Sequence, residues 1–285
     1  MDFYEKTLNE QGIEGLLAKA IRDEKVLSSE KIALTPSIIQ DPQNYIILPA
    51  GTYGKHDYPD LLIGMRRLSY NSDVEAVNQR NGWQIKNTAK VVDVNHSYDY
   101  IGNINHEQAI QLNQELGNAT PSLVLGREFL RLLDSGINSK KKVYDGAGKT
   151  LDGVILRRVF DDITKVQDPR RAEWFDTGFS GTKKDMKITY PVYTENHWEY
   201  TTEDLEDCLM KNRILGIVLD DWLTNSTSQG LPLKDSKKGE LSYRYPKNKR
   251  VARFGAYSIW FGLDCGWYPS YAYASLGVRC MRAKI

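Results

Sequence analysis

Hydrophobic residues recur along this chain with two different periods, and each period predicts a different kind of element. Helical spacing occurs in three segments, residues 106–116, 121–133 and 154–163. The first of these has Asn105 in place to cap its start, Gln108 three residues further on, and Gly117 to end it. We expect the first two helices to be antiparallel neighbours.

Shorter apolar runs predict strands at residues 45–49, 61–68, 186–193, 251–261 and 276–285. Turn-forming residues predict loops at 51–60 and 143–152, and a long exposed loop at 226–249. We also expect an amphipathic helix in the first 25 residues, a short helix at 202–211 with acids in its first turn, and a buried apolar segment at 214–222.

These helices and strands interleave without a regular βαβ rhythm and without internal repeats. The fold class is therefore predicted to be α+β rather than a doubly wound parallel sheet. The simplest domain organisation has an N-terminal helical extension at residues 1–45 and one domain at residues 46–285.

Composition excludes several classes of function. The 38 basic and 37 acidic residues nearly cancel, so no global field directs the chain to nucleic acid or to an anionic membrane. The amino terminus lacks an uninterrupted apolar run, so we expect neither a signal peptide nor membrane insertion. Cys208, Cys265 and Cys280 have no CxxC spacing and the four histidines lie far apart, so we expect no metal site and no cofactor. Free thiols are favoured over a bond between Cys265 and Cys280.

None of the familiar catalytic motifs is complete in this sequence. The sequence GAGKT at 146–150 resembles the end of a phosphate loop, but Val143 stands where that loop needs its first glycine, so a turn is favoured. Acidic pairs at 161–162 and 220–221 lie in helical or apolar stretches, where capping and surface roles are commoner than acid–base chemistry. The basic residues of 234–253, with Tyr243 and Tyr245 among them, are interpreted as a solvated loop.

The most informative segment is residues 252–285, where tyrosine is unusually frequent. Its glycines, tryptophans and small residues form a frame: Gly255, Trp260, Gly262, Leu263, Cys265, Gly266, Trp267, Pro269, Ala272, Ala274, Leu276, Gly277, Val278 and Arg279. Between them lie Tyr257, Ile259, Phe261, Asp264, Tyr268, Tyr271 and Tyr273. These seven share no chemistry, but each is reachable from an Asn codon by changing adenines alone. None is Trp, Met, Lys, Gln or Glu, which that route cannot produce.

With those seven positions set back to Asn, residues 252–279 read ARFGANSNWNGLNCGWNPSNANASLGVR. This segment resembles the variable region of the target proteins of diversity-generating retroelements, whose template repeats are Asn-rich and whose variable regions close in a GVR-like strand. Three other segments are similar to C-type-lectin-fold and formylglycine-generating-enzyme-like domains. They are the helix pair HEQAIQLNQELG and TPSLVLGREFLRLL, the strip RRAEWFDTGF at 170–179, and LDDWLTNSTSQGLP at 219–232.

The resemblance spans roughly residues 60–285 and implies a C-type lectin-like fold with its variable region at about 252–285. It implies a non-catalytic binding protein that recognises a macromolecular ligand, most simply a protein, through the seven variable positions. Tyrosine suits such a surface because it offers a large amphipathic area with few rotamers to fix. Asp264 would be the polar element that selects a donor or cation on the ligand.

Strand alternation would place Tyr257, Ile259 and Phe261 on one exposed face, with Trp260 and Trp267 as scaffold. Tyr271 and Tyr273 would share another face, with Ala272 and Ala274 packing inward. The competing interpretation makes Tyr257, Ile259 and Phe261 the buried face of a β-strand.

Two other functions stay open at this point. One is an enzyme of the formylglycine-generating type, which would need Cys265 and Cys280 as a reactive pair. The other is a nucleic-acid module that uses the basic loop at 234–253. For the location of the protein, the sequence leaves the cytoplasm and display on a virion or cell surface through another protein as alternatives.

Overall fold

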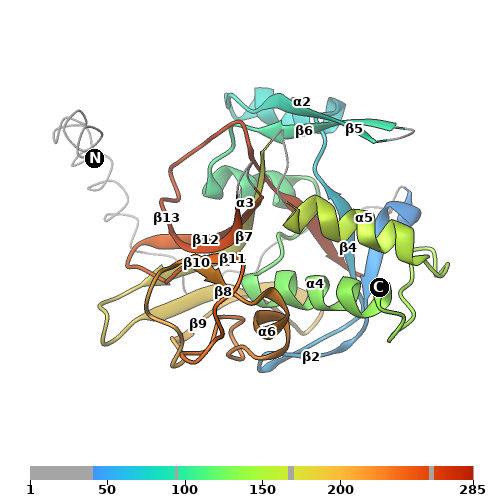
Figure 1. Ribbon diagram of the computed structural model, residues 1–285. Helices are drawn as coiled ribbons and strands as arrows, with labels where there is room; N and C mark the ends of the chain where they lie inside the picture. Colours follow the sequence, from blue (N-terminus) through green and yellow to red (C-terminus); the bar gives the residue numbers. More distant parts are fainter. Residues whose placement is uncertain (1–40, 94–95, 166–169, 257–259, 285) are drawn as a thin grey trace.

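The computed structural model describes residues 41–93, 96–165, 170–256 and 260–284 (Figure 1). It shows a mixed α+β protein with a core made mostly of sheet, which confirms the predicted class. The helix predicted in the first 25 residues lies outside the described part of the chain. Among the described helices, none combines the length and the apolar character needed to cross a bilayer.

The largest sheet runs in the order β10-β11-β13-β12-β7-β8-β9, and β14 pairs with β7 beside it. Its strands are β7 (Arg171–Ser180), β8 (Lys187–Thr194), β9 (His197–Asp204), β10 (Arg213–Ile217), β11 (Leu241–Arg244), β12 (Arg250–Ala256), β13 (Phe261–Trp267) and β14 (Leu276–Gly277). Most pairs are antiparallel, but β11 with β13 and β14 with β7 are parallel. The C-terminal segment therefore supplies strands at the centre of the sheet.

A second sheet joins the two ends of the described chain. It contains β1 (Tyr45–Leu48), β4 (Leu61–Arg67) and β15 (Arg279–Ala283), with β4 in the middle. Two hairpins complete the strands, β2 (Gly51–Tyr53) with β3 (His56–Tyr58), and β5 (Lys86–Asp93) with β6 (His96–Gly102). The predicted strands at 45–49 and 61–68 are confirmed, whereas the stretch expected to be a loop at 51–60 forms the first hairpin.

The described helices are α2 (Ser72–Arg80), α3 (His106–Glu115), α4 (Leu123–Ile137), α5 (Gly153–Thr164) and α6 (Leu219–Thr224), with a short 3₁₀ turn, η1, at Pro42–Asn44. Four of them, α2 to α5, begin at a residue whose side chain caps them. At the start of α3, Asn105 and Gln108 form the reciprocal bonds of a capping box, as their spacing predicts. Ser122 caps α4 and Asp152 caps α5.

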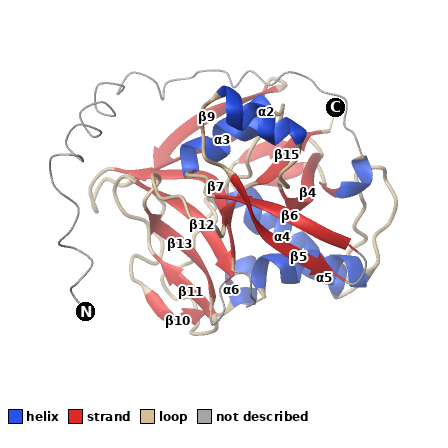
Figure 2. Cartoon of the chain, turned by 90° about the horizontal axis from the view of Figure 1, so that it is seen from above, coloured by secondary structure: helices blue, strands red, loops and turns tan. Residues whose placement is uncertain are grey.

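Helices α4 and α5 lie side by side in both views (Figures 1 and 2) and pack on β7 and β12. Helix α3 packs on β7 and α2 instead, so the expectation that it neighbours α4 is wrong. The chain between α3 and α4 instead pairs with β15, because Ala119 exchanges both backbone hydrogen bonds with Met281. The apolar faces fill two buried clusters, the larger around α4 and α5 and the smaller around Trp174.

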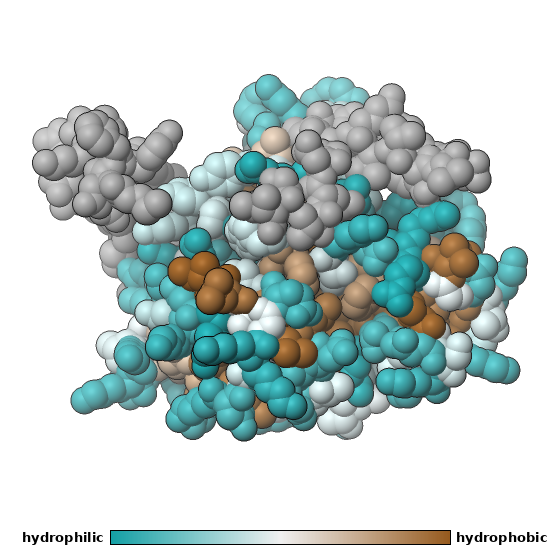
Figure 3. All heavy atoms as spheres, viewed as in Figure 1, coloured by the Kyte–Doolittle hydropathy of each residue, from teal (hydrophilic) through white to brown (hydrophobic). Residues whose placement is uncertain are grey.

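Three expectations about the second half of the chain are wrong. The predicted helix at 202–211 is the end of β9 and a following loop. The stretch at 226–249 is not an exposed loop throughout, because it contains β11 and the fully buried Leu231 and Tyr243. In the segment expected to be buried, Ile214 and Leu215 of the edge strand β10 are largely exposed. The face in Figure 3 is mostly hydrophilic, with hydrophobic residues in small separate groups.

Candidate ligand-binding surface

Four aromatic side chains of the C-terminal segment gather at one place on the surface. They are Trp267, Tyr268, Tyr271 and Tyr273, and we call them the aromatic patch. The ring centroids of Tyr268 and Tyr271 lie 4.9 Å apart, and Trp267 lies 5.9 Å from Tyr271 and 6.1 Å from Tyr273. Tyr268 is 45% exposed and Tyr273 is 48% exposed, while the other two are half-buried. Such a cluster offers a large contact area to a partner.

Two arginines of β12 stack on these rings. The guanidinium carbon of Arg250 lies 3.4 Å from the ring centroid of Tyr268, and that of Arg253 lies 3.4 Å from the centroid of Trp267. Arg253 is buried, and its Nη2 lies 3.7 Å from Oδ2 of Asp264. Cation–π contacts that exclude water are stronger than exposed ones, so Arg253 helps to fix the position of Trp267.

The loop that carries the three tyrosines is held by its backbone. The carbonyl oxygen of Tyr273 accepts a hydrogen bond from the Asn103 amide at 2.9 Å, and that of Pro269 accepts one from the His106 amide at 3.0 Å. The Ser275 carbonyl accepts from the Ala172 amide at 2.8 Å. Backbone bonds do not depend on the identity of the side chain. Positions 268, 271 and 273 can therefore change without loss of the bonds that hold the loop.

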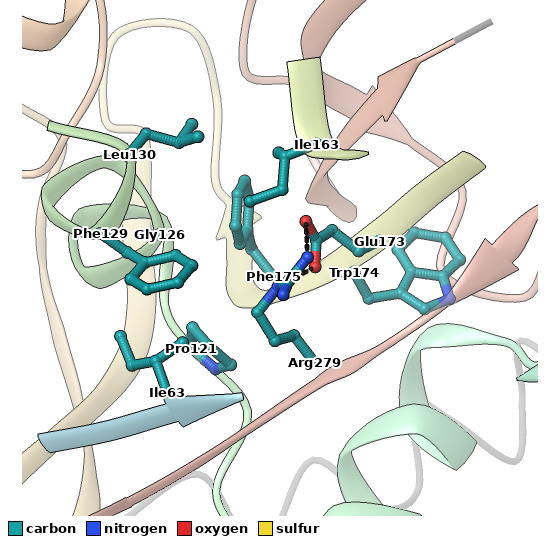
Figure 4. A pocket seen from close by; sticks show the side chains of 10 residues that line it. All are labelled: Ile63, Pro121, Gly126, Phe129, Leu130, Ile163, Glu173, Trp174, Phe175 and Arg279. Carbon is teal, nitrogen blue, oxygen red and sulfur yellow. Dashed lines mark hydrogen bonds and ion pairs between the residues drawn. The ribbon is translucent and has the colours of Figure 1, made fainter. Parts of the chain in front are cut away.

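The frame of the same segment is buried where the loop returns to the sheet. Strand β14 pairs with β7 in parallel, with Leu276 opposite Ala172 and Gly277 opposite Glu173. Arg279 then forms an ion pair with Glu173, with Nε 2.9 Å from Oε2, and donates from Nη1 to the Gly64 carbonyl at 2.7 Å. Figure 4 shows this pair beside a pocket lined by apolar side chains of α4 and β7. The RAEW and GVR segments, about a hundred residues apart in the sequence, thus meet in the core.

One frame glycine is required by a close approach of two backbones. Gly262 pairs with Ser242 of the parallel strand β11, and a Cβ atom on Gly262 would lie 2.4 Å from the Ser242 carbonyl oxygen. A side chain at this position would push β11 and β13 apart, which explains why glycine stands here.

The structure divides the seven predicted site residues into groups. Tyr268, Tyr271 and Tyr273 form the patch with Trp267, whereas Tyr257 and Ile259 lie outside the described residues. Phe261 is half-buried and its ring centroid lies 6.3 Å from that of Phe254.

Two of the predicted side-chain orientations are wrong. Strand β12 ends at Ala256 and Phe261 lies opposite it on β13, so residues 251–261 do not form one alternating strand. Ala272 and Ala274 are exposed rather than packed inward, because residues 271–273 are irregular and residues 274–275 form a turn, so no strand runs through them.

Asp264 lies below the surface and not among the exposed rings. Its side chain is 4% exposed, its Oδ1 accepts a hydrogen bond from the Gly266 amide at 3.0 Å, and its Oδ2 lies 3.7 Å from both Arg253 and Arg244. Asp264, expected to contact a ligand, lies instead beside Arg253, where its carboxylate can help to hold that guanidinium group. Arg253 belongs to the stretch interpreted as a solvated basic loop, but it is buried in β12 beside the buried Val251 and Phe254.

The two cysteines that an enzyme of the formylglycine-generating type would need as a reactive pair lie in different sheets. Cys265 lies in the large sheet and Cys280 in the small one, and both are buried free thiols, as favoured from the sequence. Burial raises the pKa of both thiols, which opposes formation of the reactive thiolate. In the described part of the chain, no group of three His, Cys, Asp or Glu side chains is placed to hold a metal ion.

The basic stretch at 234–253 does not present one continuous cationic stripe. Lys234 forms an ion pair with Asp207 at 2.5 Å, and Arg253 and Tyr243 are buried.

Comparison with known proteins does not identify a family for this chain, because no family model, no curated protein and no solved structure matches it.

Proposed function

We propose that this chain is a variable ligand-binding protein of the kind encoded beside diversity-generating retroelements, and that the aromatic patch is its binding surface. The observation that carries this proposal is the division of the C-terminal segment. Tyr268, Tyr271 and Tyr273, which are reachable from Asn codons, converge on the surface, while Leu276, Val278 and Arg279 of the frame are buried.

The finer fold assignment, a C-type lectin-like domain at residues 46–285 of the formylglycine-generating-enzyme-like variety, belongs to the same proposal. It is supported by the places of the segments that carry the resemblance. The helix pair becomes α3 and α4, the RAEW strip becomes β7, and the segment at 219–232 begins as α6. All four elements supply side chains to the two buried clusters beneath the C-terminal strands.

The genetic test is to sequence the DNA on both sides of the gene. We expect a near-copy of the last hundred or so bases next to a reverse transcriptase, differing from the gene only where the copy carries adenines. Differences should fall in the codons for 257, 259, 261, 264, 268, 271 and 273. A copy that differs at frame codons instead, or the lack of any copy, would contradict the retroelement origin.

The binding test uses a displayed library in which positions 261, 268, 271 and 273 carry the residues that adenine changes in Asn codons can produce. Selection against a purified protein, streptavidin, should yield binders. In such a binder, replacing an aromatic residue at 268 or 271 by Ala should weaken binding by about 1–3 kcal/mol, because few aromatic anchors dominate a binding interface.

The same alanine substitutions should leave the protein folded. Tyr268→Ala and Tyr273→Ala are each expected to change the free energy of unfolding by less than about 1 kcal/mol, because both side chains are nearly half exposed. A library of equal size at the four exposed positions Lys140, Lys141, Lys142 and Lys149 is the control. If the two libraries yield binders equally often, the patch has no special role in recognition.

A further inference from the structure

A buried charged cavity lies away from the aromatic patch, between α5, β4, β7 and β15. Five ionisable side chains line it: Arg67, Asp162, Arg171, Glu173 and Arg279. Ile163, Ala172 and Phe254 close the remaining walls. Three arginines and two carboxylates leave one positive charge in excess, among side chains that are almost entirely buried, where screening by water is weak.

The two carboxylates are already bonded to two of the arginines. Glu173 pairs with Arg279 at 2.9 Å, and Asp162 pairs with Arg171 and also accepts a hydrogen bond from the Tyr100 hydroxyl at 3.1 Å. A weaker contact of 3.9 Å joins Asp162 to Arg279. The charge of Glu173 also acts favourably on Arg67, but Glu173 is bonded to Arg279 and neither carboxylate forms an ion pair with Arg67.

Arg67 is the cation in excess. It is 4% exposed, and its Nη1 donates to the carbonyl oxygens of Ala172 at 2.7 Å and Ser275 at 2.9 Å. Its guanidinium carbon lies 4.4 Å from the ring centroid of Tyr100. Among the described residues it forms no ion pair, which is unusual because a buried charge without a counter-ion is costly.

Two donors of the cavity wall also lack acceptors. Nε of Arg67 and Nε of Arg171 are buried and have no hydrogen-bond partner among the described residues. The pKa of both arginines is lowered to about 10, mainly by burial and to a smaller extent by a neighbouring cation, Arg279 for Arg67 and Arg67 for Arg171. Even so, both guanidinium groups remain charged at neutral pH, so the site attracts negative charge.

We propose that this cavity binds a single small anion, a halide such as chloride, between Arg67 and Arg171. The space admits only a particle close to water in size, which excludes phosphate and carboxylate ligands. A water molecule could accept from the two Nε–H groups, but it would leave the excess charge unbalanced. A halide can accept hydrogen bonds from both Nε–H groups and also balances the excess positive charge.

This site would also support the loop of the aromatic patch, because Arg67 holds the carbonyl of Ser275. The inference does not depend on the proposed function. It concerns a structural ion that the folded chain needs whatever ligand the patch recognises.

The direct test is diffraction from crystals of the whole protein grown with sodium bromide, measured at the bromine absorption edge. We expect an anomalous peak within hydrogen-bonding distance of Nε of Arg67 and of Arg171. Peaks confined to the surface, or an ordinary water density in the cavity, would overturn the proposal.

Thermal unfolding gives a second, independent measurement. With gluconate replacing chloride at constant ionic strength, Tm should rise by about 3 °C for each tenfold increase of chloride above its Kd. Arg67→Met should abolish this dependence. The control is Arg66→Met, the same change at an exposed position of the same strand, which should preserve the dependence. A chloride effect of equal size in Arg67→Met would refute the site, and if that variant does not fold, the bromide measurement decides alone.

Discussion

Replacing Arg279 by Met should lower the free energy of unfolding by about 3–5 kcal/mol. Arg279 is 3% exposed, pairs with Glu173, and donates to the Gly64 carbonyl, so it joins β15, β7 and β4 at one point. Methionine fills similar space but removes the cation, so the buried carboxylate of Glu173 loses its ion-pair partner and Asp162 loses a weaker contact of 3.9 Å. Urea unfolding followed by tryptophan fluorescence measures the change.

Two comparisons separate the lost charge from lost packing. The double variant Glu173→Gln with Arg279→Met should recover part of the loss, because the main uncompensated carboxylate is then neutral. Arg157→Met on the exposed face of α5 should cost less than about 0.5 kcal/mol. If Arg279→Met costs no more than Arg157→Met, then the ion pair does not join the two sheets as we describe.

Local sequence was sufficient where an element depends on its own residues. Helix α3 is an example, because Asn105 and Gln108 supply both halves of its capping box. Helices α4 and α5 also lie where their apolar periods placed them, although α4 is buried on nearly all sides along its first two turns. The strands β1, β4 and β8 were found for the same reason, as short runs of apolar residues bounded by turn residues.

Local sequence misled where a distant partner decides the structure. The acids that suggested a helix start at 202–211 belong partly to β9, whose pairing with β8 continues as far as Asp204. The polar stretch at 226–249 is ordered by remote contacts. Gln229, for example, is fully buried and bonds the backbone of Asp204 and Glu206. Strand β11 exists because it pairs with β13, twenty residues further on.

The candidate site shows the same division. The codon pattern identified the tyrosines that form the aromatic patch, because that pattern belongs to the segment itself. The stacking of Arg250 and Arg253 and the backbone bonds from Asn103 and His106 could not be foreseen, since they depend on how β12 and α3 approach the loop. The inward position of Asp264 follows from the same approach.

Substitution by Ala should cost much more stability at Trp174 of the RAEW strip than at Trp267 of the patch. Trp174 is 1% exposed, donates from Nε1 to the Ile104 carbonyl at 3.0 Å, and has the His106 ring 5.5 Å away. Its removal leaves a large cavity in the smaller buried cluster, so Trp174→Ala should lower the free energy of unfolding by about 3–5 kcal/mol. Urea unfolding measures this loss directly.

Trp267 is the matched comparison, because it is half-buried and its ring lies between Arg253 and the patch tyrosines. Trp267→Ala should cost only about 1–2 kcal/mol of stability, since less apolar area is buried there. In a binder selected at positions 261, 268, 271 and 273, however, it should weaken affinity at least tenfold, because Tyr271 and Tyr273 lose the ring against which they rest. Equal losses of stability for the two variants would mean that Trp267 belongs to the core and not to a surface built for recognition.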